Sequence, residues 1–150
     1  MTRREAVLAT VLPSFTITPE RGQLVFFAEV TGDRDPLHVD LQAARAAGLP
    51  DLLVPPTFLF SLELKRPEPY RVLEAVGAEL SQALHGEQRF TYHRPVHAGE
   101  ELELAPRIVD YYEKKDGAMR FVVRRTEVRR DGDLVAELEN ILILRAGRAA

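Results

Sequence analysis

Two side chains able to move protons, Asp33 and His38, lie five positions apart in the stretch VTGDRDPLHVD at residues 30–40. A carboxylate and an imidazole at one site can divide general acid and base work. Gly32 permits a tight exit from the preceding segment, and Pro36 fixes φ and is expected to keep the chain extended. Both side chains can then point at one spot. The alternative is structural: Asp33 and Pro36 form a turn, and His38 is a satisfied, partly buried histidine.

A second group of polar residues invites a metal-site interpretation: His85, Glu87, His93 and His97. On a helix, His93 and His97 would share one face because they are four residues apart. Arg94 and Pro95 between them instead favour a strand that ends in a turn. The sequence therefore predicts no metal site here.

The elements that must position these side chains are helical in the first half of the chain. Helical patterns cover residues 18–31, 41–47, 55–66 and 70–80. Thr18 as a cap and Pro19 at the first helical position mark the start of the first helix, and Gly32 marks its end. Asp40 caps the second helix, which Gly48 ends. The third is apolar on most sides, so it belongs in the middle of the fold.

The second half of the chain reads as strands. Partly alternating β-branched and aromatic residues cover 84–94, 101–115, 118–130 and 134–145. Asp116-Gly117 and Asp131-Gly132 stand in two of the gaps, and Asp-Gly between strand-like runs indicates a hairpin. The last three strands should form an antiparallel meander. The class is α+β, with a sheet wrapped around a helix.

Composition indicates one domain, residues 1–150, large enough to bury roughly two thirds of the surface that its unfolded chain exposes. The formal net charge is −3, from 20 basic and 23 acidic residues, which favours neither nucleic acid nor an anionic membrane as a partner. There is no cysteine, so disulfides, thiolate metal sites and a cysteine nucleophile are excluded. The N-terminal apolar run is broken by Pro13, too early for a signal peptide or membrane span. We expect a cytoplasmic protein.

Several of these residues resemble a known motif. Gly32, Asp33, Pro36, His38 and Asp40 are similar to the hydratase motif of the MaoC-like (R)-specific enoyl-thioester hydratases and dehydratases. Three later blocks resemble the N-terminal MaoC-like, fatty-acid-synthase-type dehydratase branch: VPPTF at 54–58, LHGEQRFTYHRP at 84–95 and AGEEL at 98–102. The blocks follow the family's order. The resemblance implies the hotdog fold, a curved antiparallel sheet wrapped around one long central α-helix.

The resemblance also implies a reaction, the reversible hydration of 2-enoyl thioesters to (R)-3-hydroxyacyl thioesters. In the resembled enzymes the aspartate and histidine of the motif, here Asp33 and His38, jointly hold one water. The acyl group would be carried by coenzyme A or by the phosphopantetheine of an acyl carrier protein, as part of the substrate. No metal or redox cofactor is implied.

Two positions depart from the family pattern. Asp35 replaces the usual Asn, which keeps an acceptor oxygen and adds a carboxylate near Asp33. At the start of the central helix the family often has His-Gly, whereas here two prolines precede Thr57. Because proline has no N–H, the amides of Thr57 and Phe58 are the remaining candidates to stabilise charge on the thioester oxygen. The alternative is that the prolines simply start a buried helix.

The acyl pocket is expected to take its walls from Phe58, Phe60 and Leu62 or their neighbours. His85 and Gly86 in the LHGEQ block are candidates for substrate contact, and structural bracing is the alternative for His85.

Five arginines make residues 118–132 locally basic: Arg120, Arg124, Arg125, Arg129 and Arg130. Since side chains alternate along a strand, Arg124 and Arg125 should face opposite ways. A solvated outer sheet face explains the group, and attraction of coenzyme A phosphates or an acidic carrier protein is the functional alternative.

We expect a homodimer, or a heterodimer with a second hotdog protein, because the active sites of hotdog dimers lie at the interface. Three other functions stay open. The chain could be a non-catalytic subunit that shapes the acyl tunnel of a catalytic partner, although Asp33 and His38 argue against it. It could be a hotdog thioesterase, for which Glu63 is the only acid in the central helix. It could also bind acyl-CoA without turnover.

Overall fold

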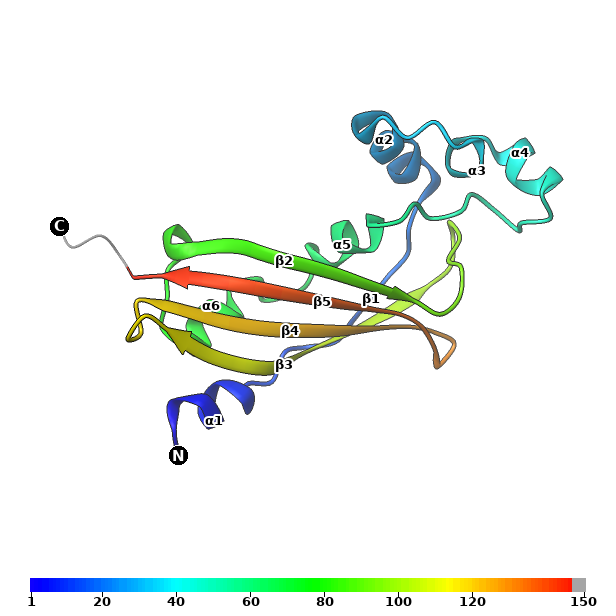
Figure 1. Cartoon of the computed structure of the whole chain (residues 1–150). Helices are drawn as coiled ribbons and strands as arrows, with labels where there is room; N and C mark the ends of the chain where they lie inside the picture. The colour runs from blue at the N-terminus through cyan, green and yellow to red at the C-terminus, as the bar shows by residue number, and fades with distance from the viewer. Residues whose placement is uncertain (147–150) are drawn as a thin grey trace.

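A five-stranded antiparallel sheet forms the framework of the protein (Figure 1). The computed structural model describes residues 1–146. The strands are β1 (Phe15–Ile17), β2 (Ala83–Tyr92), β3 (Leu102–Lys114), β4 (Met119–Arg130) and β5 (Asp133–Arg145), in the spatial order β1-β3-β4-β5-β2. The predicted meander of the last three strands is confirmed. Strand β1 was missed because a pairing of three residues is too short to show alternation.

Both predicted hairpin turns are confirmed. The β4–β5 connection is the pair Asp131 and Gly132, with φ of 50° and 82°. Two consecutive residues with positive φ match the twist of the flanking strands, which is why Asp-Gly is favoured there. The β3–β4 turn contains Asp116 and Gly117, also with positive φ.

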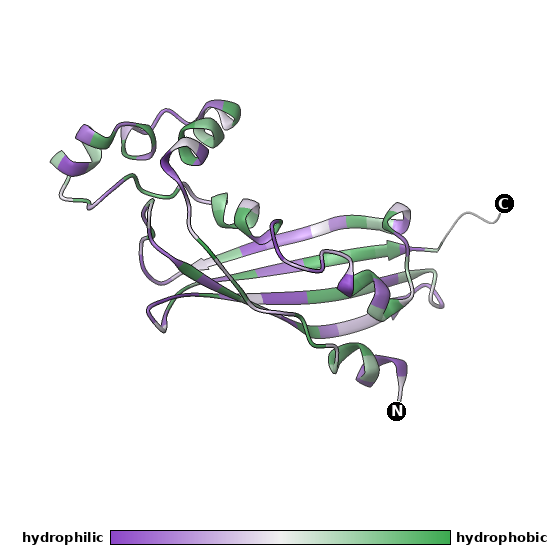
Figure 2. Ribbon diagram, turned by 180° about the vertical axis from the view of Figure 1, so that it is seen from behind, coloured by the Kyte–Doolittle hydropathy of each residue, from purple (hydrophilic) through white to green (hydrophobic). Residues whose placement is uncertain are grey.

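The helices are short and are arranged in two groups. They are α1 (Arg3–Leu8), α2 (Arg21–Thr31), α3 (Pro36–Val39), α4 (Leu41–Ala46), α5 (Phe58–Glu63), α6 (Arg71–Val76) and the 3₁₀ turn η1 (Leu80–Gln82). Helices α5 and α6 lie against one face of the sheet, whereas α2, α3 and α4 gather beyond one end of it (Figures 1 and 2). No helix within residues 1–146 is long and apolar enough to cross a membrane.

Helix α2 begins later than the sequence predicts. Thr18 and Pro19 are neither its cap nor its first residue, because the chain leaves β1 in an extended conformation. Glu20 is the cap, and it forms a reciprocal capping box with Gln23. The predicted end at Gly32 is confirmed, with φ of 71° in the left-handed region.

The central helix is also much shorter than expected. Instead of residues 55–66, α5 covers Phe58–Glu63, so the long helix implied by the resemblance is absent from the described chain. Thr57 stands before it in a left-handed conformation, φ 73°, which no helical residue adopts. Beyond it Pro67 disfavours helical geometry at the preceding residue. Six residues make little more than a turn and a half, so packing must hold α5 in place.

The buried side chains form two clusters on the helix-covered side of the sheet. The larger cluster joins α2, α4 and α5 to the sheet, and it includes Leu24, Ala44, Leu52, Phe58, Leu59, Leu62, Leu102, Leu104, Val128 and Leu138. The smaller joins α1 and α6 to the sheet, and it includes Val7, Val72, Leu73, Val76, Ile108, Tyr111, Val122 and Leu144. Along the strands, hydrophobic and hydrophilic residues interchange (Figure 2), as expected for a sheet with one covered face.

An ion pair fixes the start of α2 to the loop that leads to α5. Arg21 donates from Nη2 to Asp51 Oδ2 at 2.7 Å and from Nε to Asp51 Oδ1 at 2.9 Å. The hydrogen bonds from Arg21 lower the pKa of Asp51 from its ordinary 3.8 to about 2. A planar guanidinium and a carboxylate can form such a paired contact, which also fixes their orientation.

The lowered pKa of Asp51 predicts a pH effect on stability. The contribution of this carboxylate is fully present above its unfolded pKa, and it is lost as the pH falls through about 3.8 towards about 2. Over that interval the free energy of unfolding of the wild type should fall more steeply than that of Asp51→Asn in urea titrations. Arg21→Met should flatten the slope as well, because it removes the cause of the shift. Equal slopes in all three proteins would contradict the assignment.

Candidate active site

Asp33 and His38 are in direct contact. His38 Nδ1 lies 2.6 Å from Asp33 Oδ2, and the histidine is only 5 % exposed. The left-handed Gly32 ends α2 and turns the chain, so that the Asp33 N–H donates to the carbonyl of Ala28 at 2.8 Å. The predicted pairing of this carboxylate and imidazole is therefore present in the structure.

The local conformation differs from the expectation. Pro36 does not keep the segment extended; it is the first residue of α3, one helical turn that places His38 back towards Asp33. Proline suits this position because its missing N–H would have no helical partner and its φ is already helical. Asp35 caps the turn by accepting from the Leu37 N–H at 2.9 Å. Its acceptor oxygen therefore braces the loop, as Asn would.

Hydrogen bonds keep the Asp33 carboxyl ionised. The backbone N–H of Asp35 donates to Asp33 Oδ1 at 2.9 Å, and the His38 ring contacts the other oxygen. The amide of Asp35 first, and the His38 ring second, lower the pKa of Asp33 below its ordinary value. An ionised carboxylate accepts, so Nδ1 carries the ring proton. In the neutral ring Nε2 is then left as the basic nitrogen.

His38 lines a cavity of about 520 Å³. The wall comes from the α3 turn, the residues before α5, the first turn of α5 and the end of β2: Asp35, His38, Leu53, Val54, Pro56, Leu59, Tyr92, His93, Arg94, Pro95 and Val96. Its size is in the range of small-molecule sites, and most of its lining is apolar with a few polar groups. The site is thus a basic nitrogen at the wall of an apolar pocket.

Tyr92 is the polar group that sequence reasoning missed. Its hydroxyl accepts from the Thr57 N–H at 2.9 Å, and burial raises its pKa. In the described chain the Tyr92 O–H has no acceptor of its own. The signal was available, because Tyr92 and His93 end the strand block that resembles the family, at the edge nearest the α3 turn.

The other predicted site residues lie elsewhere. The Phe58 N–H donates to the carbonyl of Pro55 at 3.2 Å, so this amide has an internal partner. Phe60 stacks on His85 with ring centroids 5.0 Å apart, and both line a second cavity. Gly86 occupies a β-bulge where an added Cβ would lie 2.6 Å from the Ile143 side chain, so its lack of a side chain is a packing requirement.

The histidines considered as metal ligands are held apart by separate carboxylates. His93 Nε2 lies 2.9 Å from Glu137, and His97 Nδ1 lies 3.1 Å from Glu100. Within residues 1–146 no group of three or more His, Cys, Asp or Glu side chains is placed to hold a metal ion.

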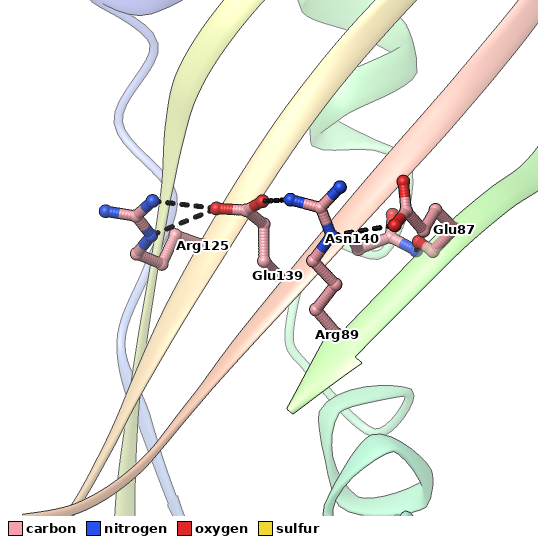
Figure 3. Close-up of polar contacts among 5 residues, drawn as sticks. All are labelled: Glu87, Arg89, Arg125, Glu139 and Asn140. Carbon is pink, nitrogen blue, oxygen red and sulfur yellow. Dashed lines mark hydrogen bonds and ion pairs between the residues drawn. The ribbon is translucent and has the colours of Figure 1, made fainter. Parts of the chain in front are cut away.

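The neighbouring arginines on β4 face opposite ways, as predicted. Arg125 lies on the outer face, where Glu139 joins it to Arg89, which in turn pairs with Glu87 (Figure 3). These charges neutralise one another, which weakens the case for phosphate attraction. Arg124 is buried on the helix side and not on a solvated face, because it pairs with a glutamate of α5.

The sheet with helices on one face, and the chain order of its elements, define a MaoC-like hotdog protein of the dehydratase class. The chain belongs to the family described as the FAS1-like dehydratase domain region, which matches residues 9–138. The hotdog fold implied by the resemblance is therefore confirmed, apart from the length of its central helix.

Relatives and solved structures agree with this family. A UPF0336 protein of Saccharopolyspora erythraea is 36 % identical over 120 residues, 79 % of this chain and 76 % of that protein. Several other UPF0336 proteins match over about half of their length. The truncated HadBC (3R-hydroxyacyl-ACP dehydratase) complex of Mycobacterium tuberculosis superposes with a TM-score of 0.72 at 25 % identity, covering 89 % of this chain and 96 % of that one. A MaoC-like dehydratase gives a TM-score of 0.78 at 21 % identity, covering 95 % and 44 %.

The contacts of Asp33 predict how its titration responds to mutation. His38→Ala removes the second cause of the lowered pKa, so the Asp33 midpoint should rise towards 3.8 but stay below it, because the Asp35 amide remains. Carboxyl ¹³C NMR measures the midpoint. Asp35→Asn keeps that amide and is the matched control, with a midpoint still below 3.8. A midpoint in His38→Ala at or below that of the wild type would contradict the assigned contact.

Proposed function

We propose that this protein is a hydro-lyase that reversibly adds water across the double bond of a 2-enoyl thioester to give the (R)-3-hydroxyacyl thioester. The carrying observation is the hydrogen-bonded Asp33–His38 pair at the wall of a mostly apolar cavity of about 520 Å³. The coarser statement, a hotdog dehydratase fold, rests on the family; the reaction and its substrate are proposed here.

The pair can manage the proton transfer of hydration. His38 Nε2 takes a proton from the water as its oxygen bonds to C3, and the same proton then goes to C2, so that one water is added in total. Asp33 holds the ring through Nδ1 and stabilises the imidazolium that forms in between. Dehydration runs through the same steps in reverse. The pair needs no metal or redox cofactor for this chemistry.

Charge that develops on the thioester oxygen needs a donor. The Thr57 N–H, one of the two predicted donors, points at the Tyr92 hydroxyl, and the Phe58 N–H is engaged with Pro55. We therefore assign the role to Tyr92, whose O–H has no acceptor in the described chain and whose raised pKa keeps it protonated at neutral pH. The Thr57 amide strengthens it, because accepting a hydrogen bond makes a hydroxyl a better donor.

A second hotdog subunit fits the exposed edge of the sheet. Strand β2, ten residues long, pairs with β5 on one side and ends the sheet on the other. Such an edge can pair with another chain. We propose a dimer formed there, either of two copies or with a different hotdog protein; the structural neighbour HadBC is itself a complex. The thioester carrier, coenzyme A or acyl carrier protein, implies action in the cytoplasm.

The thioesterase alternative is disfavoured by the position of Glu63. It is 1 % exposed, pairs with Arg124 at 3.1 Å and accepts from Thr126, and it does not line the cavity of His38. A carboxylate so enclosed has no route to a thioester in that cavity. The tunnel-shaping subunit and the non-catalytic binder differ from the proposal in one respect only, because neither uses the Asp33–His38 pair chemically.

Mutation of the pair tests the proposed reaction. Asp33→Asn and His38→Ala should each lower the rate of enoyl-CoA hydration by roughly 10²- to 10⁴-fold, since each removes part of the acid–base unit. Loss of enoyl-thioester absorbance gives the rate, and circular dichroism checks the fold. Asp110→Asn, an exposed carboxylate that pairs with Arg4, is the matched control and should keep the wild-type rate.

A partner requirement is resolved with the same variants. If the chain alone is inactive on short and long enoyl-CoA and acyl-carrier-protein substrates, a second hotdog protein is added and the mixture is repeated with Asp33→Asn. Loss of activity in that mixture places the chemistry on this chain. Unchanged activity makes this chain the non-catalytic subunit.

Removing the Tyr92 hydroxyl tests the charge-stabilising role. Tyr92→Phe keeps the ring and should lower kcat by about 10²- to 10³-fold with a smaller effect on KM, because the hydroxyl acts on charge that develops in the transition state. Tyr112→Phe on β3, which stacks on Phe121, is the control. An unchanged kcat in Tyr92→Phe would show that another donor serves the oxygen.

A further inference from the structure

A second cavity, of about 350 Å³, lies beside the short α5 and is separate in its lining from that of His38. It is bounded by the residues after α5, by α6 and by β2, β4 and β5. Apolar side chains supply most of its wall, among them Phe60, Leu64, Leu73, Leu80 and Leu142. The early end of α5 leaves this space beside the sheet.

A buried arginine with spare donors stands in this wall. Arg124 is 6 % exposed, and its Nε donates to Glu63 Oε1 at 3.1 Å. Its two terminal nitrogens have no acceptor among residues 1–146. A buried guanidinium that leaves most of its donors unpaired is costly unless a further acceptor reaches it. Arg124 thus offers the paired donor geometry that suits a carboxylate.

A second guanidinium makes the cavity electropositive. Arg66 also lines it, and it is held by the carbonyls of Glu63 and Pro69. Burial first, and then the positive charge of Arg124, lower the pKa of Arg66. No acidic side chain lines the cavity; Glu63, buried behind Arg124, is the one carboxylate that offsets the two cations.

We propose that this cavity binds the carboxylate of an aliphatic chain, with the carboxylate on Arg124 and Arg66 and the chain against the apolar wall. Two sources share this chemistry: a free fatty acid, or the ω-carboxyl end of an acyl thioester whose reacting end lies at His38. The second source rests on the proposed function. The first does not.

Calorimetric titration with octanoate and with octan-1-ol tests the site without any activity. The wild type should bind octanoate at least roughly tenfold more tightly than the alcohol, because the charge-assisted contact is available to the carboxylate alone. Glu63→Gln/Arg124→Met neutralises the buried pair and should lose about that factor for octanoate while octan-1-ol binds as before. Equal binding of the two ligands by the wild type, or unchanged octanoate binding by this variant, overturns the proposal.

Two further variants control for folding and for charge. Arg66→Gln changes a partly exposed residue and should weaken octanoate several-fold even if the double variant does not fold; unchanged binding there overturns the shared role of Arg66. Glu139→Gln/Arg125→Met makes the same exchange on the outer face of the same strand, one residue away. It should bind octanoate as the wild type does, and an equal loss in it would overturn a specific site.

Kinetics then distinguish the two sources. If the carboxylate belongs to the substrate, enoyl-CoA with an ω-carboxyl end should have a kcat/KM roughly tenfold above its methyl-ended counterpart, and Glu63→Gln/Arg124→Met should abolish that preference. If the ligand is a free acid, octanoate binds and the two substrates are used alike. A chain without hydratase activity would refute the proposed function alone, since the calorimetric result stands by itself.

Discussion

The contact of Glu63 with Arg124 and Thr126 fastens the central helix to the sheet, and both cavities depend on it. A helix of six residues cannot persist alone in water. It is held by its apolar side chains and by this one buried ionic contact to β4. Breaking such a pair by removing one partner typically costs about 3–5 kcal/mol, although replacing both partners by apolar groups can be neutral. The pair therefore fixes where α5 lies, and with it Leu59 at one cavity and Phe60 at the other.

The candidate active site is built from local hydrogen bonds in a short loop. Gly32 ends α2, Asp35 caps the single turn of α3, and Asp40 caps α4 by accepting from two amides. Each cap satisfies backbone donors that would otherwise lack a partner at a helix start. The consequence is a rigid arrangement in which Asp33 and His38 meet although five residues separate them. Preorganisation of this kind is what proton transfer to a bound substrate requires.

The short α5 distinguishes this chain from the hotdog pattern of one long central helix. The space that a longer helix would fill is an electropositive cavity here, whereas arginines on the outer face of the same strand are neutralised by glutamates across β5 and β2 (Figure 3). Adjacent residues of one strand thus have opposite surroundings. The helix side can select a ligand by charge, while the outer face is a solvated ladder of ion pairs.

The sequence by itself determined the α+β class, the two Asp-Gly hairpins, the caps at Gly32 and Asp40, and the candidate pair Asp33 and His38, because each depends on neighbours within a few residues. It did not determine the extent of α5, the start of α2 or the helical turn at Pro36. Those depend on the pairing of β1 with β3 and on competing local conformations that packing selects. Only the tertiary structure brought Tyr92 to Thr57 and Arg124 to Glu63, since these partners lie 35 and 61 residues apart and strand register decides which side chains meet.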